Sequence, residues 1–111
     1  MLDGLQGEGL LGSTTVLVLS ELARTPGRNA DGGKDHWPWT SALVLGGGLP
    51  GGRVLGGTDD ALQSVPVDLH TGQPDPSGTW LEPAHLLAGV AETLDVDPRQ
   101  WWADTQPLKL A

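Results

Sequence analysis

The sequence predicts an α/β protein with short, mostly parallel strands, long loops rich in glycine and proline, and a helix near the C-terminus. Two apolar runs, residues 14–20 and 40–45, predict the strands because both are short, aliphatic or β-branched, and bounded by polar residues or glycine. Residues 83–94 have the apolar spacing of a helix. Continuous apolar strands are typical of a parallel sheet covered on both faces, so we expect that arrangement.

The connection between the strands, residues 21–39, is predicted to be a loop because it has neither helical nor strand periodicity. A connection this long without structure of its own is usually functional or disordered. It holds Arg24, Arg28 and Lys34, which are three of the six basic residues, beside the only acid-histidine dipeptide, Asp35-His36. We interpret the loop as part of an active site.

The helix at 83–94 has Pro83 at its favoured first position and Glu82 beside its positive end. Its apolar residues are expected to form one face that packs on the sheet. Residues 2–12 are predicted to be the tail of a helix that begins before Met1 and is stopped by Gly12. Three weaker elements are predicted: a short strand at 53–55, a surface excursion at 57–79 with an edge strand at 65–69, and a helical turn at Trp101-Trp102 that covers the core.

Composition excludes several classes of partner. The net charge of −8 and the pI near 4.4 disfavour nucleic acid and anionic membranes, which require clustered Lys and Arg. No segment approaches the roughly 20 apolar residues of a membrane span. The chain has no cysteine, so disulfide and thiolate chemistry are excluded.

Asp35-His36 is the sharpest chemical signal because carboxylate and imidazole are both metal ligands. The residues alone leave two interpretations, a metal or catalytic site and a loop histidine bonded to the backbone. Glu21 follows the first strand, where open α/β sheets bind ligands, although a loop-capping acid is an equal alternative. Residues 46–51 fit the spacing G-x-G-x-x-G, but no helix follows Pro50, so we predict a turn there.

A set of motifs resembles a bacterial family known as domain of unknown function 1501. They are the segment Ser20–Pro26, then Asn29, Gly33–Trp37, Leu45–Gly48 and Gly51–Gly56, with the helix at 83–94 followed by Asp97-Pro98 resembling the closing segment. The family is similar to sulfatases and alkaline phosphatases. That resemblance implies an α/β sandwich like theirs, of which residues 1–111 would be one C-terminal segment.

The resemblance also implies a site. Glu21, Asp35 and His36 would bind a divalent metal, and Arg24 and Asn29 would line the same pocket and bind a small anionic ester. The nucleophile would lie outside this chain, in the missing N-terminal part of the same domain, which is also the expected partner. Family members carry an upstream twin-arginine signal, which implies export to the periplasm.

We therefore predict the C-terminal part of a metal-dependent phosphate- or sulfate-ester hydrolase, inactive alone. The alternative is a non-catalytic exported or cell-surface fragment with a binding or structural role. A free-standing small ligand-binding protein is a weaker third interpretation, since no motif favours it.

Overall fold

The first part of the chain folds as a long antiparallel hairpin. In the computed structural model, which describes all 111 residues, β1 (Thr15–Val18) pairs antiparallel with β4 (Leu43–Gly46), in a register that runs from Thr15 opposite Gly46 to Val18 opposite Leu43. The two predicted strands are therefore confirmed in position. The predicted parallel sheet and the alkaline-phosphatase-like sandwich are wrong, because the chain holds only two small antiparallel sheets.

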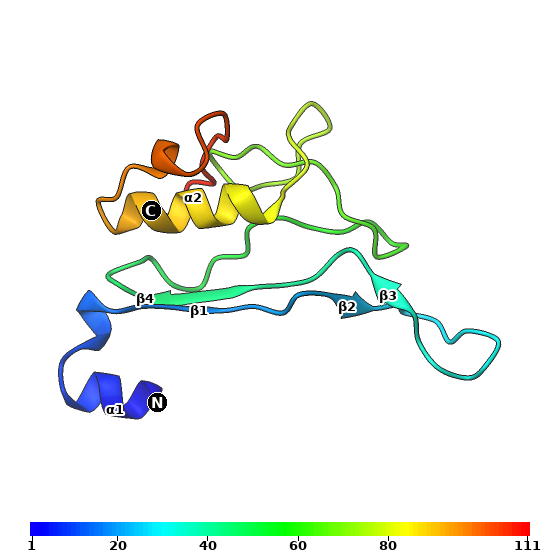
Figure 1. Ribbon diagram of the computed structural model, residues 1–111, viewed down its shortest axis with the longest axis horizontal. Coiled ribbons are helices and arrows are strands. Elements are labelled where there is room, and N and C mark those ends of the chain that lie inside the picture. The colour runs from blue at the N-terminus through cyan, green and yellow to red at the C-terminus, as the bar shows by residue number, and fades with distance from the viewer. The chain divides into compact units, whose positions relative to one another are not determined.

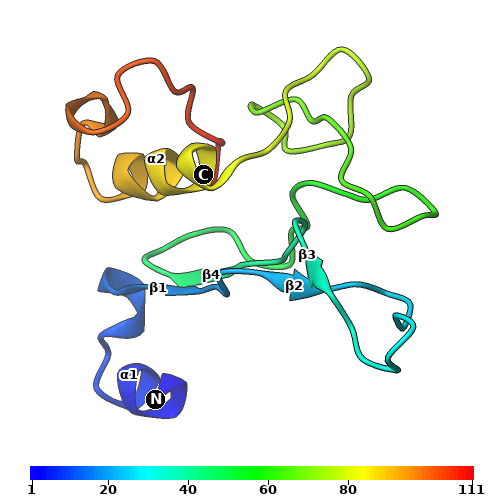
Figure 2. The ribbon, with the colours of Figure 1, turned by 45° about the vertical axis from the view of Figure 1, so that its right-hand side comes forward.

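The segment predicted to be a loop, residues 21–39, explains why β1 and β4 pair antiparallel. It contains two further strands, β2 (Ala23–Arg24) and β3 (His36–Trp37), which pair antiparallel and extend the same hairpin. A parallel pair needs a crossover, usually a helix, and residues 21–39 contain none. Figure 1 and Figure 2 show β2 and β3 continuing β1 and β4 toward a terminal loop. We call residues 15–46 the arm, and residues 21–37 its distal end.

The N-terminal segment forms two short helices before the arm. The helix α1 spans Leu2–Gly7 and the 3₁₀ helix η1 spans Leu11–Ser13, so the helix predicted to run to Gly12 ends earlier. The amide of Gly47 donates a hydrogen bond to the Leu11 carbonyl at 2.9 Å, which places η1 at the end of β4. Gly46 has φ +77°, and a Cβ there would collide with the carbonyl of Thr14. The predicted turn at 46–51 is confirmed in its first residues.

Two compact units divide the chain at Gly48, and only residues 49–111 contain a buried core. Four side chains form that core: Val67, Leu69, Leu108 and Leu110. The helix α2 (Pro83–Thr93) confirms the helix predicted at 83–94, and its Leu86 and Val90 pack against the core. In residues 1–48 no residue is buried.

Several smaller predictions fail in the second unit. Residues 53–55 form no strand, and the 65–69 segment makes only isolated bridges from Val67 to Pro74 and Thr79. Val67 is fully buried, so the predicted surface excursion supplies the core. The turn near the tryptophans is the 3₁₀ helix η2 (Pro98–Gln100), but Trp101 is exposed rather than covering the core.

None of the helices has the length and apolar composition that spanning a membrane requires.

Candidate functional site

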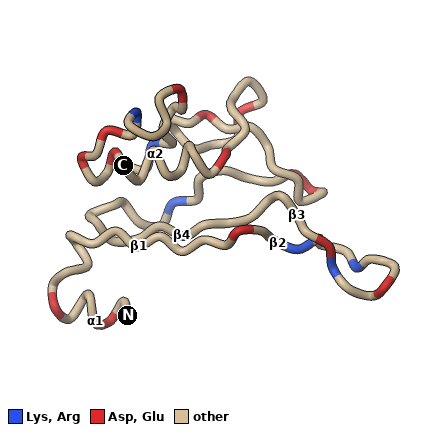
Figure 3. The backbone as a smooth tube through the Cα atoms, in the orientation of Figure 1, with Lys and Arg blue, Asp and Glu red and all other residues tan.

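The five residues predicted for the site all lie in the distal end of the arm. Arg24 is in β2, His36 is in β3, Glu21 precedes β2, and Asn29 and Asp35 belong to the terminal loop. Figure 3 shows acidic and basic residues along this part of the arm. Asn29 is half-buried, and the other four side chains are exposed to solvent.

Asn29 organises the terminal loop. Its side-chain oxygen accepts hydrogen bonds from the amides of Asp31 at 3.1 Å and Gly33 at 2.9 Å, which is the local bonding that favours Asn in turns. Its side-chain nitrogen donates to Oδ1 of Asp35 at 2.9 Å. The Asp35 amide in turn donates to Oγ1 of Thr25 at 3.1 Å. Asn29 therefore fixes the loop and orients the Asp35 carboxylate.

Arg24 and His36 lie opposite each other in the two-residue ladder of β2 and β3. Residues that are directly opposite in an antiparallel pair have neighbouring side chains. The guanidinium of Arg24 donates a hydrogen bond from Nη1 to the Lys34 carbonyl at 3.3 Å, so the Arg24 side chain extends along the arm. A cation and an imidazole therefore lie next to each other on exposed strands.

Glu21 is held in its ionised form. Hydrogen bonding from its own backbone lowers the pKa of this carboxyl below its ordinary value, and the Ser20 hydroxyl, which donates to Oε2 at 3.2 Å, lowers it further. Slight desolvation opposes this lowering of the pKa, and Arg24 and His36 add the smallest lowering effects. No ion pair joins Glu21 to either of these residues, so its ionised form is held by local hydrogen bonds.

The structure thus brings the predicted residues together as two groups. Asn29 and Asp35 are hydrogen-bonded, Arg24 lies opposite His36 in the β2–β3 ladder, and Glu21 lies outside both groups, bonded to Ser20. It does not assemble three metal-ligating side chains, because no group of three His, Asp or Glu residues in the chain could hold a metal ion. By themselves these residues do not fit a metal site of three protein ligands. The arrangement can attract an anion and exchange a proton.

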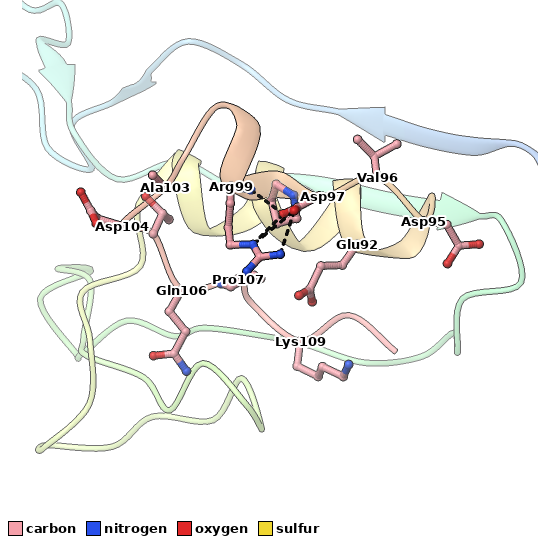
Figure 4. A pocket seen from close by; sticks show the side chains of 12 residues that line it. Glu92, Asp95, Val96, Asp97, Arg99, Ala103, Asp104, Gln106, Pro107 and Lys109 are labelled. Carbon is pink, nitrogen blue, oxygen red and sulfur yellow. Dashed lines mark hydrogen bonds and ion pairs between the residues drawn. The ribbon is translucent and has the colours of Figure 1, made fainter.

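The second unit contains a cavity that the sequence did not predict. It has a volume of about 850 Å³ and lies between the end of α2, η2 and residues 103–109 (Figure 4). Asp97 accepts bonds from Nε and Nη2 of Arg99, the latter at 2.8 Å, and this pairing lowers the pKa of Asp97. The spacing Asp-Pro-Arg is the signal that could have revealed the pair, since Asp97 also caps η2 through the Arg99 amide.

Comparison with known proteins identifies the family. The family model described as "Protein of unknown function (DUF1501)" matches residues 1–105. This chain belongs to the DUF1501 family. The match covers the whole arm and therefore all five predicted site residues, while the DUF1501 range ends before the core residues Leu108 and Leu110. No curated protein and no solved structure matches the chain. Membership in DUF1501 is thus established, while the expected similarity to sulfatases and alkaline phosphatases has no support from these comparisons.

Proposed function

We propose that this DUF1501 chain supplies part of the active site of a metal-dependent hydrolase of phosphate or sulfate esters, and that it is inactive alone. The observation that carries the proposal is that Arg24 and His36 lie opposite each other in the β2–β3 ladder, with Glu21 at the start of the same distal end of the arm. A carboxylate, a cation and an imidazole are the side chains that binding and cleaving an anionic ester requires.

Each group has a role that follows from its environment. The Arg24 guanidinium would hold the negative oxygens of the ester, for which its planar fork of donors is suited. Glu21, Asp35 and His36 would each supply one ligand to a divalent metal, and the hydrogen bond from Asn29 orients the Asp35 carboxylate for that role. A bound metal would neutralise charge that develops on the ester. Because the chain does not assemble three ligands itself, the remaining ligands and the nucleophile would come from another polypeptide segment.

The test is a titration of the chain with Zn²⁺, followed by NMR of the three histidines. We expect the ring signals of His36 to shift first, and Glu21→Gln to weaken that response. The matched control is His70→Asn, since His70 is also exposed and follows an acidic turn residue, Asp68, in the second unit. This control variant should leave the His36 response unchanged.

A second measurement follows hydrolysis of aryl phosphate and aryl sulfate by the chain with and without Zn²⁺ or Mn²⁺. We expect no turnover, because the site is incomplete. Turnover by the chain alone would contradict the claim of inactivity. If the ring signals of His36 do not shift with Zn²⁺, or shift no more than those of His70, the metal-dependent function is contradicted. The non-catalytic binding role then remains.

A further inference from the structure

Two residues at the start of α2 hydrogen-bond to each other. Glu82 directly precedes the helix, and its amide donates a hydrogen bond to Nδ1 of His85 at 2.9 Å. The His85 amide donates back to the Glu82 carbonyl at 3.0 Å. A side chain at the third helical position that accepts from the residue before the helix is half of a capping box, which stabilises the first turn.

His85 differs from the usual residue at this position in the proton it can carry. Glutamate or glutamine normally accepts this bond, and neither takes up a proton near neutral pH. An imidazole nitrogen accepts a hydrogen bond only when it carries no proton, so the bond to Nδ1 requires the neutral ring. Histidine ordinarily gains its proton between about pH 8 and about pH 5. Mild acid can therefore remove the acceptor at the start of α2.

The same residue attaches α2 to the core of the second unit. The carbonyl of His85 accepts a hydrogen bond from the amide of Leu108, a core residue, at 2.9 Å. One turn further along the helix, the Leu108 carbonyl lies too close to Gly89 for a Cβ to fit there. Leu86, the neighbour of His85, packs against the core. A change at His85 therefore acts on the contact between α2 and residues 106–110, which we call the C-terminal segment.

The charges around the ring decide whether the proton is tolerated. The positive end of α2 disfavours an imidazolium in its first turn. The Glu82 carboxylate favours one, but Glu82 is exposed, and exposed ion pairs contribute little to stability. The other charged groups on α2 and on the segments packed against it are engaged elsewhere: Glu92 and Lys109 line the cavity at the far end of the helix, Asp97 and Arg99 bond to each other, and Asp68 accepts from two amides of its own turn.

We propose that His85 is a pH-sensitive latch between α2 and the C-terminal segment. At neutral pH the ring accepts from the Glu82 amide and holds the first turn of the helix. When the ring takes up a proton from solvent, Nδ1 becomes a donor and the Glu82 amide loses its partner. The first turn then opens more often, and the bond from Leu108 opens with it. This latch lies in the second unit and does not depend on the proposed metal site, which lies in the first.

The experiment compares the unmodified full chain with His85→Gln at about pH 7.5 and about pH 5, a range in which ordinary carboxyl groups stay ionised. Glutamine can accept the same bond and does not titrate. In the unmodified chain we expect the NMR signal of the Glu82 amide to shift as the His85 ring is protonated. Urea unfolding followed by circular dichroism should show the folded-to-unfolded ratio falling roughly three- to tenfold. In His85→Gln both quantities should stay constant.

The matched control is His70→Asn, because His70 is the other histidine of the second unit. This variant should lose as much stability in acid as the unmodified chain does. The proposal is overturned if His85→Gln loses as much, or if the Glu82 amide does not respond to protonation of the ring. It is also overturned if acid stabilises the second unit, which would mean that the imidazolium pairs with the Glu82 carboxylate instead.

Hydrogen exchange of the Leu108 amide provides a readout that needs no variant. After correction for the intrinsic effect of pH on exchange, its protection in the unmodified chain should fall between about pH 7.5 and about pH 5. Unchanged protection would contradict the latch even where His85→Gln does not fold.

Discussion

The two units of this chain use apolar residues in opposite ways. The second unit closes Val67, Leu69, Leu108 and Leu110 into a core that a single helix covers. The first unit, though it contains the two most apolar runs of the sequence, spreads them along a two-stranded arm and buries nothing. Apolar content therefore does not locate the core here. Burial requires a second layer, and only the second unit supplies one from its own residues.

The largest expected difference between the units comes from removing a leucine from each. Leu108→Ala should cost about 2–5 kcal/mol of the free energy of unfolding, because Leu108 is only 2% exposed and its loss leaves a cavity. Leu43→Ala should cost less than about 1 kcal/mol, because much of that side chain already contacts water. Urea unfolding followed by circular dichroism measures both. Equal costs would contradict the contrast.

Glycine substitutions should change stability in opposite directions. A Cβ at Gly89 in α2 would collide with the Leu108 carbonyl, so Gly89→Ala should destabilise by about 1–3 kcal/mol. Gly4 in α1 has open space around the same position, so Gly4→Ala should instead stabilise by about 0.5–1 kcal/mol, as is usual in a helix. Thermal unfolding of the two variants compares the signs. A stabilised Gly89→Ala would show that α2 does not pack closely on the C-terminal segment.

The smallest expected effect is on the pKa of one carboxyl group in each unit, Glu21 in the first and Asp97 in the second. Folding lowers the pKa of both carboxyl groups from their ordinary values, 3.8 for Asp97 and 4.5 for Glu21. Each ionised carboxylate therefore stabilises the folded state above its ordinary pKa, and this stabilisation is lost as the pH falls through the pKa in the folded state. Arg99→Gln should raise the pKa of Asp97 clearly, because Arg99 supplies the largest lowering effect. Ser20→Ala should raise that of Glu21 less, because the bond from its own backbone remains.

Carboxyl ¹³C shifts recorded against pH measure both changes. Asp75, whose pKa is lowered by Ser77, provides an internal reference that neither variant touches. A larger change at Glu21 than at Asp97 would contradict this order.

Local sequence predicted where the helix and strands of this fold lie better than it predicted which segments they pair with or pack against. The positions of β1 and β4 follow from β-branched runs, and α2 follows from its spacing and from Pro83, all of which are local signals. The pairing of the strands is a long-range property that apolar runs do not encode, and this is why the parallel sheet was wrong. The core was missed because Val67 lies among Gly, Asp and Pro, and its burial depends on Leu108 and Leu110, far along the chain.

The candidate site was partly predictable for the same reason. Motif resemblance selected five polar residues close in sequence, and the hairpin keeps them close in space. The bond from Asn29 to Asp35 could have been anticipated from the turn residues between them. The placement of Arg24 opposite His36 depends on the β2–β3 register, which no pattern in this segment specifies.

The position of Leu108 and Leu110 sets the time at which the second unit can fold during synthesis. The amides of Leu108 and Lys109 also bond to His85 and Leu69, at 2.9 and 2.8 Å, so this segment ties the helix to the loops. A nascent chain on the ribosome cannot close that core until Leu110 has left the exit tunnel. A truncation that removes Leu108 and Leu110 would therefore leave Val67 and Leu69 without half of their core.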